Sequence, residues 1–118
     1  MLNMEVNGRI LHIQLAPGPA AEALKDFLKD DFLELPMKDY AHMEKFGDLG
    51  VRLPEQEEYM TTRAGDLILW EERFLVLYYA SNTWKFTKLG QVADMTGQEL
   101  RRILGSGNIT AKFWLSGE

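Results

Sequence analysis

The chain has 118 residues, a formal net charge of −5 and no cysteine. This length fits one domain, predicted to span residues 1–118, and the lack of cysteine excludes disulfides, thiolate metal sites and cysteine nucleophiles. An acidic domain without a basic stripe is a poor match for a phosphate backbone, so we expect no nucleic-acid partner.

The N-terminus lacks a basic start followed by an apolar run, so we predict no signal peptide. No window approaches the roughly 20 apolar residues that span a bilayer, and we therefore expect a cytoplasmic protein without a membrane partner. The two histidines, His12 and His42, have no carboxylate at ligand spacing, so we predict no metal site and no cofactor.

The first third of the chain contains clear local signals. Two alternating runs around Asn7-Gly8 predict a β-hairpin over residues 2–15, because this dipeptide suits a type I′ turn. Pro19 fits the first turn of a helix, and the apolar spacing after it predicts a helix over about 19–29.

The middle of the chain is less regular. Leu33, Leu35 and Met37 alternate with polar residues and predict a short strand, in which Pro36 indicates an edge or a bulge. Residues 38–63 hold glycines, a proline and many charges, and we expect the least regular structure there. A connection of this length inside a compact domain is either functional or partly structured.

The second half predicts more strands and another helix. The pattern of residues 64–92 predicts three strands, and the one at 74–79 has no alternation, so both of its faces should be covered. Thr96 and Glu99 form a capping box at the start of a second helix, and residues 108–115 alternate as a last strand. Together these elements predict a mostly β domain, an antiparallel β-barrel capped by two helices.

The order of these elements resembles that of cyclophilins. Residues 65–67 are similar to a glycine-any-leucine strand of that family, 74–79 to its aromatic-rich strand, and 89–92 to the turn before its second helix. Over nearly its full length the chain more closely resembles the small bacterial and archaeal cyclophilin-like proteins. The shared features are the early Asn7-Gly8, Met37 and Asp39 at a strand end, Leu53-Pro54, the Ala-Gly-Asp-Leu-any-Leu-Trp stretch from Ala64, and Gly-Ser-Gly from Gly105.

The departures from cyclophilins concern catalysis. Cyclophilins polarise the prolyl amide with an arginine on the strand before the long crossing, but this chain has no arginine between Arg9 and Arg52. Phe86 stands at the position of the family's pocket histidine, and the glutamine of the aromatic strand has no counterpart. Isomerisation needs a donor aimed at the amide. We therefore predict a binding module without catalytic residues.

The resemblance implies a ligand site in the groove on one barrel face, for a small molecule or an extended peptide. Tyr78 and Tyr79 point to opposite faces, so only one of them can line the groove, and we choose Tyr78. Trp84 belongs to a polar loop, where a partly exposed indole can anchor a ligand. For Phe46 and Phe86, core packing is the alternative. The predicted site residues are Met37, Asp39, Tyr40, Phe46, Tyr78, Trp84 and Phe86.

Two other functions stay open. One is a weak peptidyl-prolyl isomerase in which Arg52 or Lys45 replaces the missing arginine. The other is an accessory interaction domain for a redox (flavodoxin-like) partner, with the protein either a monomer or a homodimer.

Three charged residues of the irregular segment have a second interpretation. Most charges in loops are solvated, and this is the alternative to a site role for Asp39, Glu44 and Lys45.

Overall fold

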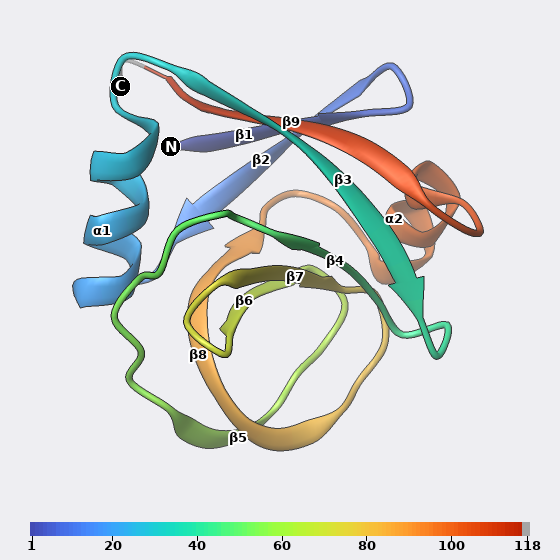
Figure 1. The fold of residues 1–118 in the computed structure, drawn as a ribbon. Helices are drawn as coiled ribbons and strands as arrows, with labels where there is room; N and C mark the ends of the chain where they lie inside the picture. Colours follow the sequence, from blue (N-terminus) through green and yellow to red (C-terminus); the bar gives the residue numbers. More distant parts are fainter. Residues whose placement is uncertain (117–118) are drawn as a thin grey trace.

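The computed structural model describes residues 1–116, which form nine strands and two helices (Figure 1). The strands are β1 (Leu2–Val6), β2 (Arg9–Leu15), β3 (Phe32–Tyr40), β4 (Glu44–Asp48), β5 (Glu58–Thr61), β6 (Asp66–Trp70), β7 (Phe74–Tyr78), β8 (Thr83–Val92) and β9 (Ile109–Leu115), and the helices are α1 (Pro19–Leu28) and α2 (Gly97–Leu104). Neither helix has the length and apolar character needed to cross a membrane.

The strands close into an antiparallel barrel. Its order is β2-β1-β9-β3-β4-β7-β6-β8, and the pairing of β2 with β8 completes the circle. The remaining strand, β5, lies outside this order. It pairs with the first half of β8, which leaves the barrel and curves away from it (Figure 1). The predicted fold class, a mostly β antiparallel barrel with two helices, is confirmed.

The predicted hairpin and both predicted helices are present. Asn7 and Gly8 have φ values of 49° and 77°, as a type I′ turn requires. The Asn7 side chain also donates to the Ile103 carbonyl at the end of α2, at 2.8 Å. At the start of α2, Thr96 and Glu99 form the expected capping box.

The barrel interior is the main hydrophobic core, and both helices contribute to it. Leu24 and Leu28 of α1, and Leu100 and Leu104 of α2, are buried in one cluster with the inward side chains of the strands. The two helices lie on opposite sides of the barrel (Figure 1). This arrangement leaves the outer face of β4, β6 and β7 to be covered by other means.

A second, smaller cluster covers that outer face. Leu75 and Leu77 of β7 point into the barrel core, whereas Val76 and Tyr78 belong to the second cluster. The prediction that the strand at 74–79 is covered on both faces is therefore confirmed. The members of the second cluster are Ile68, Val76, Tyr78 and Phe86, with Phe46, Met60 and Phe74 packed against them.

The segment 38–63 is more regular than its sequence predicts, since it contains the end of β3 and all of β4 and β5. A tight turn joins β3 to β4 through Ala41 and His42, both with positive φ. Pro36 lies where β3 pairs with β9 alone, because its pairing with β4 begins only at Lys38. This placement agrees with the edge position that the proline indicates.

Candidate functional site

A cavity of about 350 Å³ lies on the outer face of the barrel, beside the second cluster. β3, β4, β6 and β7 supply its base, and the departing half of β8 supplies one wall. Five of the seven predicted site residues line it. The lining side chains are Tyr40, Glu44, Phe46, Trp70, Val76, Tyr78, Asn82, Trp84 and Phe86.

Strand pairing explains why these side chains meet. Glu44 of β4 lies directly opposite Tyr40 of β3 on one side and Tyr78 of β7 on the other. Two residues along, Phe46 lies opposite Val76 in the same way. Because side chains alternate along a strand, these residues all face outward while their chain neighbours face the barrel core.

The base of the cavity is apolar and well packed. Phe86, Val76 and Tyr78 are buried, and the rings of Tyr78 and Phe86 meet edge to face with centroids 5.6 Å apart. Tyr40 and Phe46 are also perpendicular, at 83° and 6.4 Å. Aromatic pairs favour this edge-to-face geometry. The aromatic rings therefore form walls at steep angles to one another.

The rim of the cavity carries three exposed aromatic side chains. Tyr40 and Trp84 are each 59% exposed, and Trp70 is 42% exposed. Trp84 lies near the start of β8 rather than in a loop. Trp70 is not among the predicted site residues, although strand alternation from Ile68, a member of the second cluster, places both on the same face.

The polar groups of the cavity are few. Asn82 donates to the Tyr78 hydroxyl at 3.4 Å, and that hydroxyl donates to the Glu44 carboxylate. Burial raises the pKa of Glu44, the Tyr78 hydrogen bond opposes this shift, and the nearby Asp39 carboxylate adds to it. Burial also raises the pKa of Tyr78, so its hydroxyl remains a proton donor.

Asp39 lies outside this cavity, on the opposite side of β3 from Tyr40. Its Oδ1 is 3.0 Å from Nζ of Lys45, which is fully buried and also donates to the carbonyls of Gly105 (2.9 Å) and Gly107 (2.6 Å). The Tyr79 hydroxyl donates to Asp39 as well. These contacts connect β3 and β4 to the loop between α2 and β9, so neither Asp39 nor Lys45 is a solvated loop charge.

The pKa values in this network follow from its contacts. Burial alone would raise the pKa of Asp39, but hydrogen bonds from Tyr79, Lys45 and the His42 backbone, with the charge of Lys45, hold it below its usual value. Burial and the Asp39 carboxylate together raise the pKa of Tyr79 to about 12. Asp39 is therefore ionised and Tyr79 is neutral at physiological pH.

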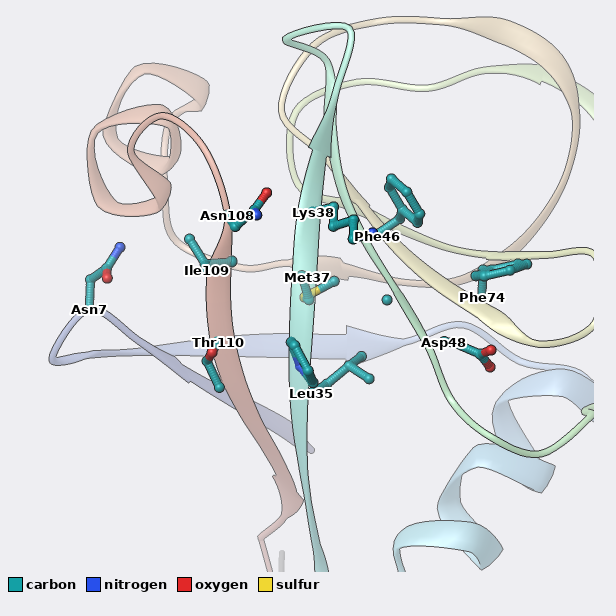
Figure 2. A pocket seen from close by; sticks show the side chains of 12 residues that line it. Asn7, Leu35, Met37, Lys38, Phe46, Asp48, Phe74, Asn108, Ile109 and Thr110 are labelled. Carbon is teal, nitrogen blue, oxygen red and sulfur yellow. The ribbon is translucent and has the colours of Figure 1, made fainter.

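Met37 is also absent from the aromatic cavity. Its side chain is buried in the barrel core, beneath a second hollow of about 600 Å³ over β3 (Figure 2). In Figure 2, Asn108 and Thr110 of β9 lie on one side of this hollow, with Phe46 and Phe74 on the other. Phe46 and Phe74 are the two aromatic side chains of this hollow, whereas six aromatic side chains line the other, so the aromatic cavity is the better candidate for a ligand.

Neither of the two cations considered as replacements for the missing arginine lines the cavity. Lys45 is committed to three oxygen acceptors, and Arg52 pairs with Glu72 at 2.8 Å on the exposed surface. Among the described lining residues there is no lysine, arginine or histidine. Within residues 1–116, no group of three or more His, Cys, Asp or Glu side chains is placed to hold a metal ion.

A closed antiparallel barrel flanked by two helices, with an aromatic cavity on its outer face, defines a barrel domain of the cyclophilin type. A family model described as the cyclophilin-like family matches residues 4–114, and the chain therefore belongs to that family. No curated protein gives a significant match.

One solved structure is similar over the whole chain. It is the structure of McbB in complex with tryptophan, with a TM-score of 0.65 and 14% sequence identity. The match covers 100% of this chain and 45% of McbB, so the chain spans less than half of that protein. At this identity the likeness shows the fold alone.

Proposed function

We propose that this cyclophilin-like domain is a binding module that holds a small ligand in the aromatic cavity. The observation that carries the proposal is the convergence of Tyr40, Trp70 and Trp84, three exposed aromatic side chains, on the rim of one cavity. Large apolar side chains left in water around a concave site are typical of ligand or partner sites.

The size and chemistry of the cavity support a small molecule. Its volume of about 350 Å³ lies near the lower end of the range for ligand pockets. An apolar base with a few polar groups, here Glu44, Tyr78 and Asn82, is the usual composition of such pockets. McbB, which shares the fold, is described in complex with tryptophan, and this supports a small aromatic ligand. An extended peptide is the alternative occupant.

A titration followed by NMR tests the proposal, with indole and tryptophan as the first probes. We expect shifts confined to cavity residues, and Trp84→Ala should weaken binding by at least ~1 kcal/mol. Tyr59→Ala is the matched control, because Tyr59 is an exposed aromatic of neighbouring β5 that does not line the cavity. Equal losses in the two variants, or shifts scattered over the surface, would contradict the proposal.

The isomerase alternative has its own test. With no cationic side chain among the described residues of the cavity lining, we expect prolyl isomerisation about a hundredfold or more slower than in an ordinary cyclophilin, because an oriented donor typically supplies that factor. The assay includes Arg52→Ala and Lys45→Ala. A turnover within about tenfold of a cyclophilin, lost in either variant, would favour the isomerase.

A further inference from the structure

Glu44 is the one charged side chain among the described residues of the cavity lining. It is half-buried between Tyr40 and Tyr78, its direct neighbours on the adjacent strands. Its carboxylate accepts from the Tyr78 hydroxyl, and it belongs to none of the ion pairs among residues 1–116. Among the described residues of the lining, no cationic side chain therefore neutralises the Glu44 carboxylate.

Asp39 differs from Glu44 in its partners. Asp39 is the neighbouring acid on the opposite face of the same strand pair, and it has Lys45 at 3.0 Å and the Tyr79 hydroxyl as partners. Burying a carboxylate without a cation costs free energy, and a cation placed beside it recovers much of that cost. Lys45 supplies this cation for Asp39, whereas none of the described residues forms an ion pair with Glu44.

The rings around Glu44 add a second attraction for positive charge. Tyr40 is its cross-strand neighbour, and Trp84 and Trp70 expose large parts of their ring systems at the rim. The face of an aromatic ring attracts ammonium groups, most strongly in tryptophan. The edge-to-face pairs Tyr40–Phe46 and Tyr78–Phe86 turn the rings of the rim and base in different directions, so a bound ammonium can meet a ring face while the apolar part of the ligand lies on the base.

Negatively charged ligands are disfavoured for the same reason. The described lining contains no lysine, arginine or histidine that could pair with a ligand carboxylate, and the whole chain carries a net charge of −5. A negative protein surface raises the local concentration of cations and repels anions.

Resting on the proposed function, we infer that the ligand is a small aromatic amine without a carboxylate, with its ammonium on Glu44 and on the faces of the rim aromatics. The carboxylate fixes the position of the charged end, and the apolar base formed by Phe46, Val76 and Phe86 receives the ring.

Three probes of nearly equal size separate charge from shape: 2-phenylethylamine, 2-phenylethanol and phenylacetate. Their affinities are measured by NMR titration of the intact protein at neutral pH and low salt. We expect the amine to bind about tenfold more tightly than the alcohol, as a partly desolvated ion pair aided by cation–π contact allows, and the acid to bind most weakly. The preference for the amine should shrink as salt is added.

Glu44→Gln provides the decisive variant, because glutamine keeps the shape and can still accept from Tyr78. It should remove the amine's advantage while leaving the alcohol's affinity within about twofold. Glu34→Gln is the matched control, a glutamate of β3 that lies outside the cavity, and it should leave all three affinities unchanged.

The outcomes distinguish this inference from the function on which it rests. If the alcohol binds in the cavity as well as the amine, or if Glu44→Gln leaves the amine's advantage intact, the charge preference is wrong while the binding module survives. If none of the three probes, indole or tryptophan shifts the cavity resonances, both the binding module and this inference are overturned.

Discussion

The turn between β3 and β4 carries a conformational cost that a single substitution can relieve. Ala41 and His42 have φ values of 54° and 53°, in the left-handed region. The Met43 N–H closes the turn on the Tyr40 carbonyl at 3.0 Å. The His42 side chain is almost fully exposed, and its ring nitrogen lies 3.7 Å from Asp39, so replacing it removes little packing.

We expect His42→Gly to stabilise the protein. A left-handed conformation costs about 1–2 kcal/mol in a residue with a β-carbon, whereas glycine adopts it freely. Glycine loses more backbone entropy on folding, which takes back about 0.5–1 kcal/mol. The net gain is about 0.5–1 kcal/mol, or a rise of a few degrees in Tm for a domain of this size. The backbone hydrogen bond from residue 42 to Asp39 does not need the imidazole and is retained.

The hairpin between β1 and β2 offers a reciprocal control. Gly8 has a φ of 77°, and a β-carbon built there would meet nothing within 4 Å, so Gly8→His tests the backbone cost without a clash. Urea and thermal unfolding of both variants should show His42→Gly gaining about what Gly8→His loses, about 0.5–1 kcal/mol each. A loss of stability in His42→Gly, or no loss in Gly8→His, would refute the reasoning.

Three further predictions concern the barrel and its ionised groups. Lys45→Met should lower the free energy of unfolding by about 3–5 kcal/mol, because Asp39 loses its cation; a urea-unfolding loss below about 1 kcal/mol would contradict a buried ion pair. Gly90→Ala should cost about 1–3 kcal/mol in the same assay, since the new methyl would collide with the Gln14 carbonyl where β2 closes the barrel on β8, and an unchanged midpoint would disprove this close approach. The pKa of Asp39 is lowered on folding, so its contribution is present above 3.8 and is lost as pH falls through the folded value. The pKa of Glu44 is raised, so its contribution is present below 4.5 and is lost as pH rises through the folded value. The free energy of unfolding is measured from pH 2.5 to 7, about the accessible range. The stability deficit of Asp39→Asn should shrink toward acid pH, and Glu44→Gln should gain stability relative to wild type toward neutral pH. Curves parallel to that of wild type would refute the two pKa shifts.

The parts of the fold that the sequence predicts well are those with local chemistry. Asn7-Gly8 and the Thr96–Glu99 capping box each satisfy a backbone requirement with nearby residues, and both lie where expected. The turn through Ala41 and His42 has the same tight geometry without glycine or asparagine. The usual turn signal is absent there, and β4 was therefore concealed within an irregular segment.

The missing turn signal also concealed part of the site. Without β4, nothing placed Glu44 between Tyr40 and Tyr78. Its pairing with Tyr40 depends on the concealed turn, and its pairing with Tyr78 joins residues more than 30 positions apart. The alternation of side chains along β3, by contrast, is readable from the sequence alone. Met37 and Asp39 share one face of that strand and Tyr40 lies on the other, so the three residues cannot line one cavity.

The two faces of β7 have different roles, so the cavity can change while the barrel core stays the same. Leu75 and Leu77 fill the barrel core, while Val76 and Tyr78 form the base of the cavity on the opposite face. The base residues are buried, so their replacement costs stability as well as binding. Rim residues such as Trp84 remain largely exposed, so they contribute less to folding and can change at lower cost. Changes in ligand preference should therefore arise at the rim and at Glu44, with the barrel unchanged beneath them.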